Sequence, residues 1–215
     1  MIRFTKPIMA FLAAALVVFP TIDLASETFV LTSDHCTGSC GQAPFGTIVV
    51  TDHGGGTLEF FATMFDGNEF VNTGFPLTVG FNLGGSPTIT YSNLTVGWGI
   101  PDMFGANQQG ANTYHQDGTG DFQYGVLWGQ QGGGQGTAGP LTFDINAAGL
   151  TLTSLEQNAN GQFFAVDIIS GTNGNTGNVD ASTRPIPLMV PEPASAALVG
   201  LALLGMGFVR RRRQH

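Results

Sequence analysis

Short runs of β-branched and aromatic residues, separated by glycine, asparagine, aspartate and proline, fill the chain from Glu27 to about Ile169. This pattern is typical of strands joined by turns. It predicts strands at residues 28–32, 46–52, 56–65, 77–83, 88–92, 122–128, 141–145, 150–155 and 162–169. Because no ten-residue stretch of this region shows a 3.6-residue period, we expect an all-β domain.

Two predicted strands have a pronounced apolar face. In residues 56–65 this face comprises Leu58, Phe60, Ala62 and Met64, and in residues 122–128 it comprises Phe122, Tyr124, Val126 and Trp128. Two facing sheets would bury such stripes against each other. The sequence therefore predicts a β-sandwich of jelly-roll-like type.

The composition changes on both sides of this domain. Residues 171–190 are rich in Gly and Asn and then in Pro, which is typical of a linker. Residues 1–26 contain Arg3 and Lys6, an apolar stretch from Ile8 to Phe19, and a tail of small residues, as in a secretory signal peptide. We therefore expect a signal helix at 1–26, an exported domain at 27–170, a linker at 171–190 and a separate tail at 191–215.

The domain is acidic. Between Glu27 and Val190, Arg184 is the only basic residue against thirteen carboxylates, which gives a net charge of about −12. Nucleic acid is therefore not an expected partner.

The two cysteines lie close together in HCTGSCG, as Cys36 and Cys40. In an oxidising compartment such a pair predicts a disulfide that stiffens a small loop. A metal site with His35 as third ligand is the alternative.

We expect no enzymatic activity. Lys6 is the only lysine and lies in the signal segment, and the chain contains no His-Glu-x-x-His, Gly-x-Ser-x-Gly, phosphate-loop or EF-hand motif. We expect no catalytic residue and no resident cofactor.

Two weaker sets of candidate binding residues remain. Asp102, Asp117 and Asp121 lie in a loop-like interval where Ca²⁺ could recruit carboxylates, although turns use the same residue types. A sugar-stacking platform could be formed by Trp98, Trp128 and Tyr124, although aromatic residues on strands more often pack in a core.

The tail combines three features. Pro191, Glu192 and Pro193 precede an apolar run from Ala194 to Val209, and Arg210, Arg211, Arg212 and Arg213 follow it. As a helix, this run would span about 24 Å at ~1.5 Å per residue, which makes it a short transmembrane anchor. The arginines predict a cytoplasmic end and act as a stop signal, which leaves the preceding domain outside the membrane.

This tail resembles the PEP-CTERM sorting signal of Gram-negative bacteria, with Pro191, Glu192 and Pro193 as its motif. The resemblance implies processing by exosortase, after export and transient anchoring in the inner membrane, and a final location at the cell surface or in the extracellular matrix. Proteins of this kind are commonly associated with extracellular polysaccharide and biofilm. We therefore expect a structural or adhesive protein; the alternatives are a carbohydrate-active hydrolase, a calcium-dependent glycan-binding module, or a self-associating matrix protein.

Overall fold

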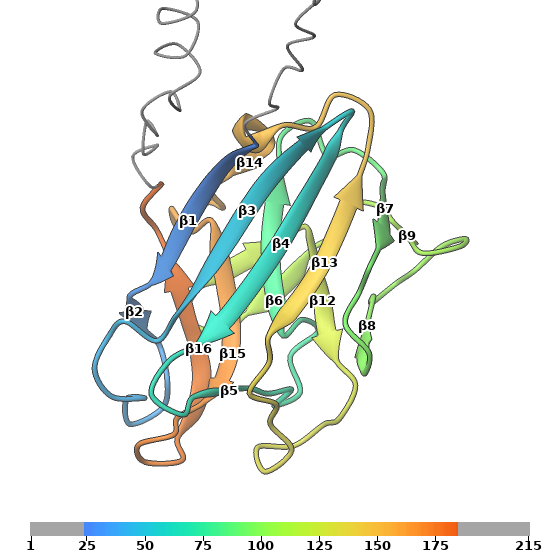
Figure 1. Ribbon diagram of the computed structural model, residues 1–215. Coiled ribbons are helices and arrows are strands. Elements are labelled where there is room, and N and C mark those ends of the chain that lie inside the picture. The colour runs from blue at the N-terminus through green and yellow to red at the C-terminus, as the bar shows by residue number, and fades with distance from the viewer. Residues whose placement is uncertain (1–23, 185–215) are drawn as a thin grey trace, which may run out of the picture.

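The computed structural model describes residues 24–184, which fold into two facing antiparallel sheets (Figure 1). The all-β prediction is confirmed for this part of the chain, whose one helical element is a 3₁₀ turn, η1 (Leu152–Ser154). The arrangement is sandwich-like, with apolar side chains of both sheets buried between the layers.

The first sheet has six strands in the order β1-β3-β4-β13-β7-β9. Their bounds are β1 (Ala25–Leu31), β3 (Gly46–Gly54), β4 (Thr57–Met64), β13 (Leu141–Asn146), β7 (Ile89–Ser92) and β9 (Gln108–Gln109). The register pairs Phe60 of β4 with Val50 of β3 and with Phe143 of β13, so apolar side chains lie opposite one another on the inner face.

The second sheet has eight strands, six of them in the order β2-β16-β15-β6-β12-β8, with β14 paired to β6 and β5 to β15. Their bounds are β2 (Ser33–Asp34), β5 (Glu69–Phe70), β6 (Val79–Leu83), β8 (Trp98–Gly99), β12 (Tyr124–Trp128), β14 (Leu155–Glu156), β15 (Phe164–Ile169) and β16 (Thr176–Ala181). At the centre, Phe81 of β6 lies between Tyr124 of β12 and Phe164 of β15 in the register.

Phenylalanine rings form the centre of the core. The Phe60 ring stacks on Phe143 with centroids 4.7 Å apart, and it lies 5.0 Å from Phe81 of the opposite sheet. The predicted apolar face of residues 56–65 is confirmed, because Leu58, Phe60 and Ala62 are buried whereas Phe61 is 40% exposed.

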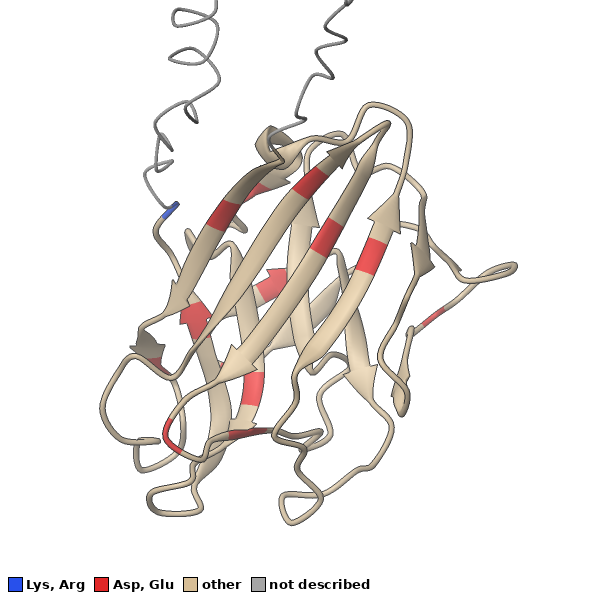
Figure 2. Cartoon of the chain, viewed as in Figure 1, with Lys and Arg blue, Asp and Glu red and all other residues tan. Residues whose placement is uncertain are grey.

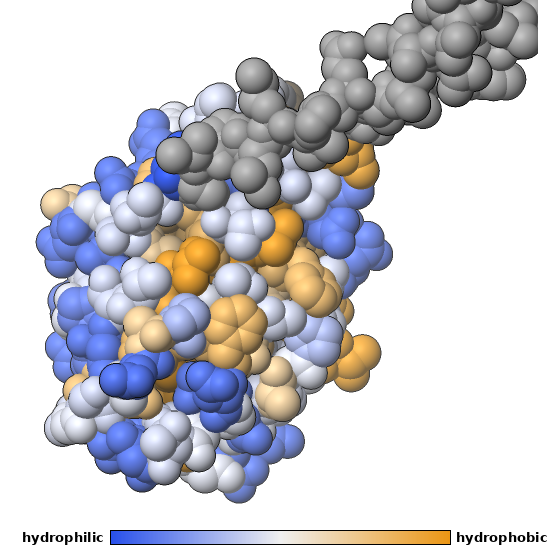
Figure 3. Space-filling model, turned by 60° about the vertical axis from the view of Figure 1, so that its left-hand side comes forward, coloured by the Kyte–Doolittle hydropathy of each residue, from blue (hydrophilic) through white to orange (hydrophobic). Residues whose placement is uncertain are grey.

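Apolar side chains also reach the surface of the molecule. Figure 3 shows apolar residues mixed with polar ones on the face that it presents. On the outer face of the first sheet, Val30 of β1 and Phe61 of β4 are each about two-fifths exposed.

A hairpin covers part of the outer face of the second sheet. It consists of β10 (Tyr114–Gln116) and β11 (Gly120–Phe122). Tyr114 and Phe122 pack there with Leu77 and Ala165 in a small second apolar cluster. The prediction that Phe122 shares a face with Tyr124 is wrong, because the chain changes course at Gln123 and Phe122 joins this cluster instead.

Two further predictions are wrong. Residues 176–181, expected in the linker, form β16, which pairs with β15 and β2. Only Val179 and Ala181 of this strand contribute apolar side chains to the core, so its hydrophobic pattern is weak. Residues 150–155, expected as a strand, contain η1, and only Leu155 of this segment begins a strand, the short β14.

Candidate functional site

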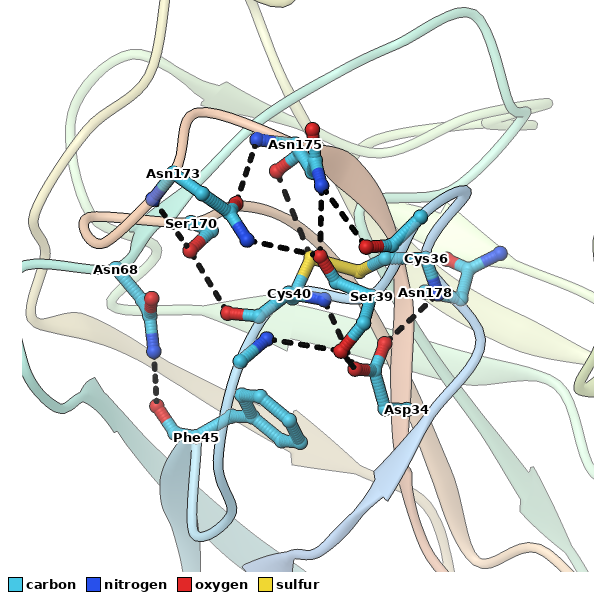
Figure 4. The surroundings of a disulfide bond; sticks show 12 residues. Asp34, Cys36, Ser39, Cys40, Phe45, Asn68, Ser170, Asn173, Asn175 and Asn178 are labelled. Atoms are coloured by element: carbon cyan, nitrogen blue, oxygen red, sulfur yellow. Dashed lines mark hydrogen bonds between the residues drawn. A yellow bond between two sulfur atoms is a disulfide. The ribbon is translucent and has the colours of Figure 1, made fainter.

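The Cys36–Cys40 disulfide is present, in the loop that follows β2 (Figure 4). The alternative metal site is wrong, because both sulfur atoms are bonded to each other and His35 Nε2 instead lies 2.6 Å from Asp180 Oδ2. Asp34 lies near both cysteines, but disulfide sulfurs offer no thiolate to a metal ion.

Asp34 organises this loop. Its carboxylate accepts hydrogen bonds from the Cys36 N–H, the Cys40 N–H and the Ser39 hydroxyl, at 2.6–2.9 Å. Burial acts to raise the pKa of Asp34, but these hydrogen bonds and the nearby His35 outweigh burial and lower it. The loop is also joined to the turn after β15, because Asn175 Nδ2 donates to the Ser39 carbonyl and Ser170 Oγ donates to the Cys40 carbonyl.

The three predicted calcium ligands do not form a cluster of metal-ligating groups within residues 24–184. Asp102 Oδ2 accepts a hydrogen bond from Asn112 Nδ2 at 3.1 Å, and Asp121 Oδ1 lies 2.8 Å from His115 Nδ1. Asp117 lies in the turn of the β10–β11 hairpin, where its carbonyl accepts a hydrogen bond from Asn178.

Of the three predicted platform aromatics, the structure brings only the two tryptophans together. Trp98 and Trp128 are cross-strand partners on β8 and β12, with ring centroids 5.7 Å apart and both side chains half-buried. Tyr124 is fully buried in the core, and its hydroxyl donates to the Pro87 carbonyl. Tyr124 cannot contact a ligand, because its position on β12 points it between the sheets.

A polar pocket of about 310 Å³ lies beside the β10–β11 hairpin. It is lined by side chains from four stretches of the chain: Asn82; Asn112 and Thr113; Asp121, Phe122 and Gln123; and Glu156, Gln157, Asn158 and Ala159. Amides and two carboxylates dominate this lining. Asp121 was singled out in the sequence, but the other residues carry no local motif, and only the fold brings them together.

The amides of this pocket are held in place by hydrogen bonds to the backbone. Asn82 Oδ1 accepts from the Gln123 N–H at 2.7 Å, and Asn158 Nδ2 donates to the Thr119 carbonyl at 2.8 Å. Glu156 packs over Gly84, where an added Cβ would lie 2.6 Å from Glu156 Oε1. The pocket therefore combines fixed amides with two exposed carboxylates, Asp121 and Glu156, a surface suited to hydrogen-bonding a polyhydroxylated ligand.

The ends of the described chain are joined by one ion pair. Arg184 Nη1 donates to both carboxylate oxygens of Glu27, at 2.9 and 2.8 Å, and Nη2 donates to the Leu155 carbonyl at 2.6 Å. The guanidinium also lies 5.0 Å from the centroid of the Phe163 ring. Glu27 belongs to β1 and Arg184 follows β16, so both ends of the described chain lie on the same side of the sandwich (Figure 1).

Carboxylates are distributed over both sheets of the described body (Figure 2), which agrees with its acidic sequence. The predicted signal helix, the Pro191–Glu192–Pro193 motif, the apolar run and the arginine cluster lie outside the described residues. Within residues 24–184 we find no helix with the length and apolar character needed to cross a bilayer.

Comparison with known proteins gives one match. The family model for the PEP-CTERM protein-sorting motif matches residues 190–213. No curated protein matches the chain, and no solved structure matches it. The match implies export, a membrane-anchored sorting signal and exosortase as the processing partner. This chain therefore carries a PEP-CTERM sorting motif at residues 190–213, as an exosortase substrate does.

Proposed function

We propose that the sandwich-like body is a structural or adhesive surface protein that binds extracellular polysaccharide in its polar pocket and has no enzymatic activity. Exosortase would process the tail, after which the body would reside at the cell surface or in the matrix. The pocket is the observation that carries this proposal.

The chemistry of the pocket favours a sugar. Sugar hydroxyls both donate and accept hydrogen bonds, and the lining offers amide donors together with amide and carboxylate acceptors. Asp121 and Glu156 add negative charge to a body that is already acidic, so a neutral glycan is the expected ligand. Trp98 and Trp128 form a second, more apolar surface on which a sugar ring could stack.

A binding assay tests the pocket. We would measure binding of the full-length chain, purified in mild detergent, to a panel of neutral and acidic polysaccharides. The double variant Asp121→Asn/Glu156→Gln should change the affinity at least about tenfold, since charged hydrogen bonds contribute about 1.5–3 kcal/mol each. The matched control, Asp144→Asn/Glu59→Gln, changes the same charges on the first sheet. If the two double variants change the affinity equally, or if the wild-type chain binds no polysaccharide, the pocket is not the polysaccharide-binding site.

A localisation assay tests the sorting role separately. Cells would express either the intact chain or a chain that lacks Pro191–His215. The intact chain should be shortened and reach the surface or the medium, whereas the truncated chain should keep its mass after export and lack the membrane-bound intermediate. Identical masses and locations would contradict sorting by the tail.

A hydrolase is the second candidate, because Asp121 and Glu156 line the same pocket. Glycoside hydrolysis needs two carboxyl groups about 5–10 Å apart. If a polysaccharide that binds is also shortened, and either Asp121→Asn or Glu156→Gln stops the shortening without abolishing binding, the hydrolase replaces the binding module.

A further inference from the structure

Buried oxygen atoms without hydrogen-bond partners gather on the outer face of the second sheet. Within residues 24–184, five buried side-chain polar atoms lack a partner, and all five are oxygens. Four of them belong to residues of the β10–β11 hairpin or of the two strands β15 and β16: Gln116 Oε1, Asp167 Oδ1, Asn178 Oδ1 and Asp180 Oδ1. Each of these four residues is at most 1% exposed.

The strand register places three of the four residues on one face. Asp167 of β15 is the cross-strand partner of Asn178 of β16, and Asp180 is the partner of Ala165. Directly paired residues share a face, and so do residues two apart on one strand. Ala165 packs in the outer apolar cluster, so Asp167, Asn178 and Asp180 all lie on the side that the hairpin covers.

The hairpin brings the fourth oxygen onto this face. Gln116 lies two residues after Tyr114, which packs in the same outer cluster, and its Nε2 donates to the Leu77 carbonyl at 2.8 Å. Asn178 Nδ2 donates to the carbonyl of Asp117, the next residue of the hairpin. Each amide nitrogen therefore has a partner, whereas both amide oxygens are left without a donor.

Within residues 24–184, no lysine or arginine side chain pairs with the carboxylates of Asp167 and Asp180. Thr73 donates its N–H and its hydroxyl to Asp167 Oδ2, and His35 faces Asp180 Oδ2. Neither contact reaches the two Oδ1 atoms. Arg184, the one arginine of the described body, is engaged with Glu27.

We propose that Gln116, Asp167, Asn178 and Asp180 bind a Ca²⁺ ion between the second sheet and the β10–β11 hairpin. Ca²⁺ takes six to eight oxygen ligands from carboxylates, amide carbonyls and water, and two carboxylates neutralise its charge. Orphaned acceptors of this kind cost about 1–3 kcal/mol each when buried, so a bound cation removes a penalty that the apo protein carries. The ligands differ from Asp102, Asp117 and Asp121, which the sequence suggested.

This site also connects to the polar pocket. Asp121 and Phe122 of β11 line the pocket, and Asn158 of the pocket donates to the Thr119 carbonyl in the hairpin turn. A cation beneath the hairpin would fix these groups relative to the sheet. The cation site itself stands independently of the proposed function; only its effect on polysaccharide binding rests on that function.

Calorimetry with CaCl₂ tests the site. The full-length chain in mild detergent, stripped with EDTA and dialysed, should bind one Ca²⁺ per chain, and its Tm should rise by about 5–10 °C at a hundredfold excess over the Kd. Asp167→Asn and Asp180→Asn should each weaken Ca²⁺ binding at least about tenfold. Loss of a group that only hydrogen-bonds to a metal ligand already lowers metal affinity by about that factor. Asp144→Asn, on the first sheet, is the matched control and should bind as the wild type does.

The variant pair in the polar pocket separates this proposal from the previous one. Asp121→Asn/Glu156→Gln should retain Ca²⁺ binding, even where its polysaccharide binding is changed. If that double variant loses Ca²⁺ binding while Asp167→Asn and Asp180→Asn keep it, the ion lies in the pocket and our assignment is overturned. The assignment is also overturned if the wild-type chain shows neither a heat of Ca²⁺ binding nor a rise in Tm. This measurement needs no variant.

Discussion

Asp34 shows how one side chain can hold a loop that has few apolar contacts of its own. Its carboxylate accepts three hydrogen bonds from within a seven-residue stretch, Asp34 to Cys40. The disulfide closes the same stretch covalently. Because hydrogen bonds to a carboxylate are stronger than those between neutral groups, the ionised form of Asp34 stabilises the loop.

Asp34→Asn should change the pH dependence of stability. The pKa of Asp34 is lowered in the folded state, so its ionisation contributes stability that is present above its unfolded pKa of about 4 and is lost as the pH falls further. Urea titrations at several pH values should therefore show wild type more stable than Asp34→Asn at neutral pH, with the difference shrinking below about pH 4. A constant difference across that range would contradict this account; Asp144→Asn is the control.

Residue-level predictions succeeded where the signal was local. The disulfide followed from two cysteines four positions apart. The residues of the polar pocket, such as Asn82 and Glu156, come from distant stretches and have the composition of ordinary turns. The buried Asn178 and Asp180 likewise resemble linker residues, because nothing near them in the sequence indicates the hairpin that covers them.

At the scale of elements, alternation in β4 determines which side chains form the core. Phe60 contacts phenylalanines of both sheets, whereas its neighbour Phe61 faces outward from the first sheet. The period-two pattern was visible in the sequence and placed the core face correctly. Strand β16 was missed because it lacks a clear alternation of buried apolar and exposed polar residues. Its outward positions are polar, and they are buried under the β10–β11 hairpin.

Phe60→Ala and Phe61→Ala form a matched pair that tests this difference. Phe60→Ala should lower the free energy of unfolding by about 3–5 kcal/mol, because it leaves a cavity among stacked rings. Phe61→Ala should cost less than about 1 kcal/mol, the range of surface substitutions. Both values would come from urea denaturation of the full-length chain; similar losses at the two positions would contradict the assigned faces.

For the whole molecule, the Glu27–Arg184 pair connects the first strand to the segment after the last one. The Glu27 side chain is 9% exposed and accepts two hydrogen bonds from the guanidinium, so loss of Arg184 leaves a nearly buried carboxylate. The sequence showed Arg184 as the lone basic residue of the domain but gave no partner for it among thirteen carboxylates.

Substitutions at this pair should be strongly non-additive. Arg184→Met should lower the free energy of unfolding by about 2–3 kcal/mol, somewhat below the cost of breaking a fully buried pair because Arg184 is partly exposed. The double variant Glu27→Gln/Arg184→Met should recover a large part of that loss. Chemical denaturation of the single and double variants measures the coupling, and additive losses would show that the two side chains act independently.

The position of this ion pair also has a mechanical consequence. Arg184 is the last described residue before the segment that leads to the sorting motif, so a pull on the tail would first act on the Glu27 contact and on β16. Strand β16 runs antiparallel between β15 and β2, and a force along it would have to shear several backbone hydrogen bonds together rather than open them one at a time. A pull directed along β16 from its C-terminal end would therefore meet the combined resistance of its ladder to β15 and β2.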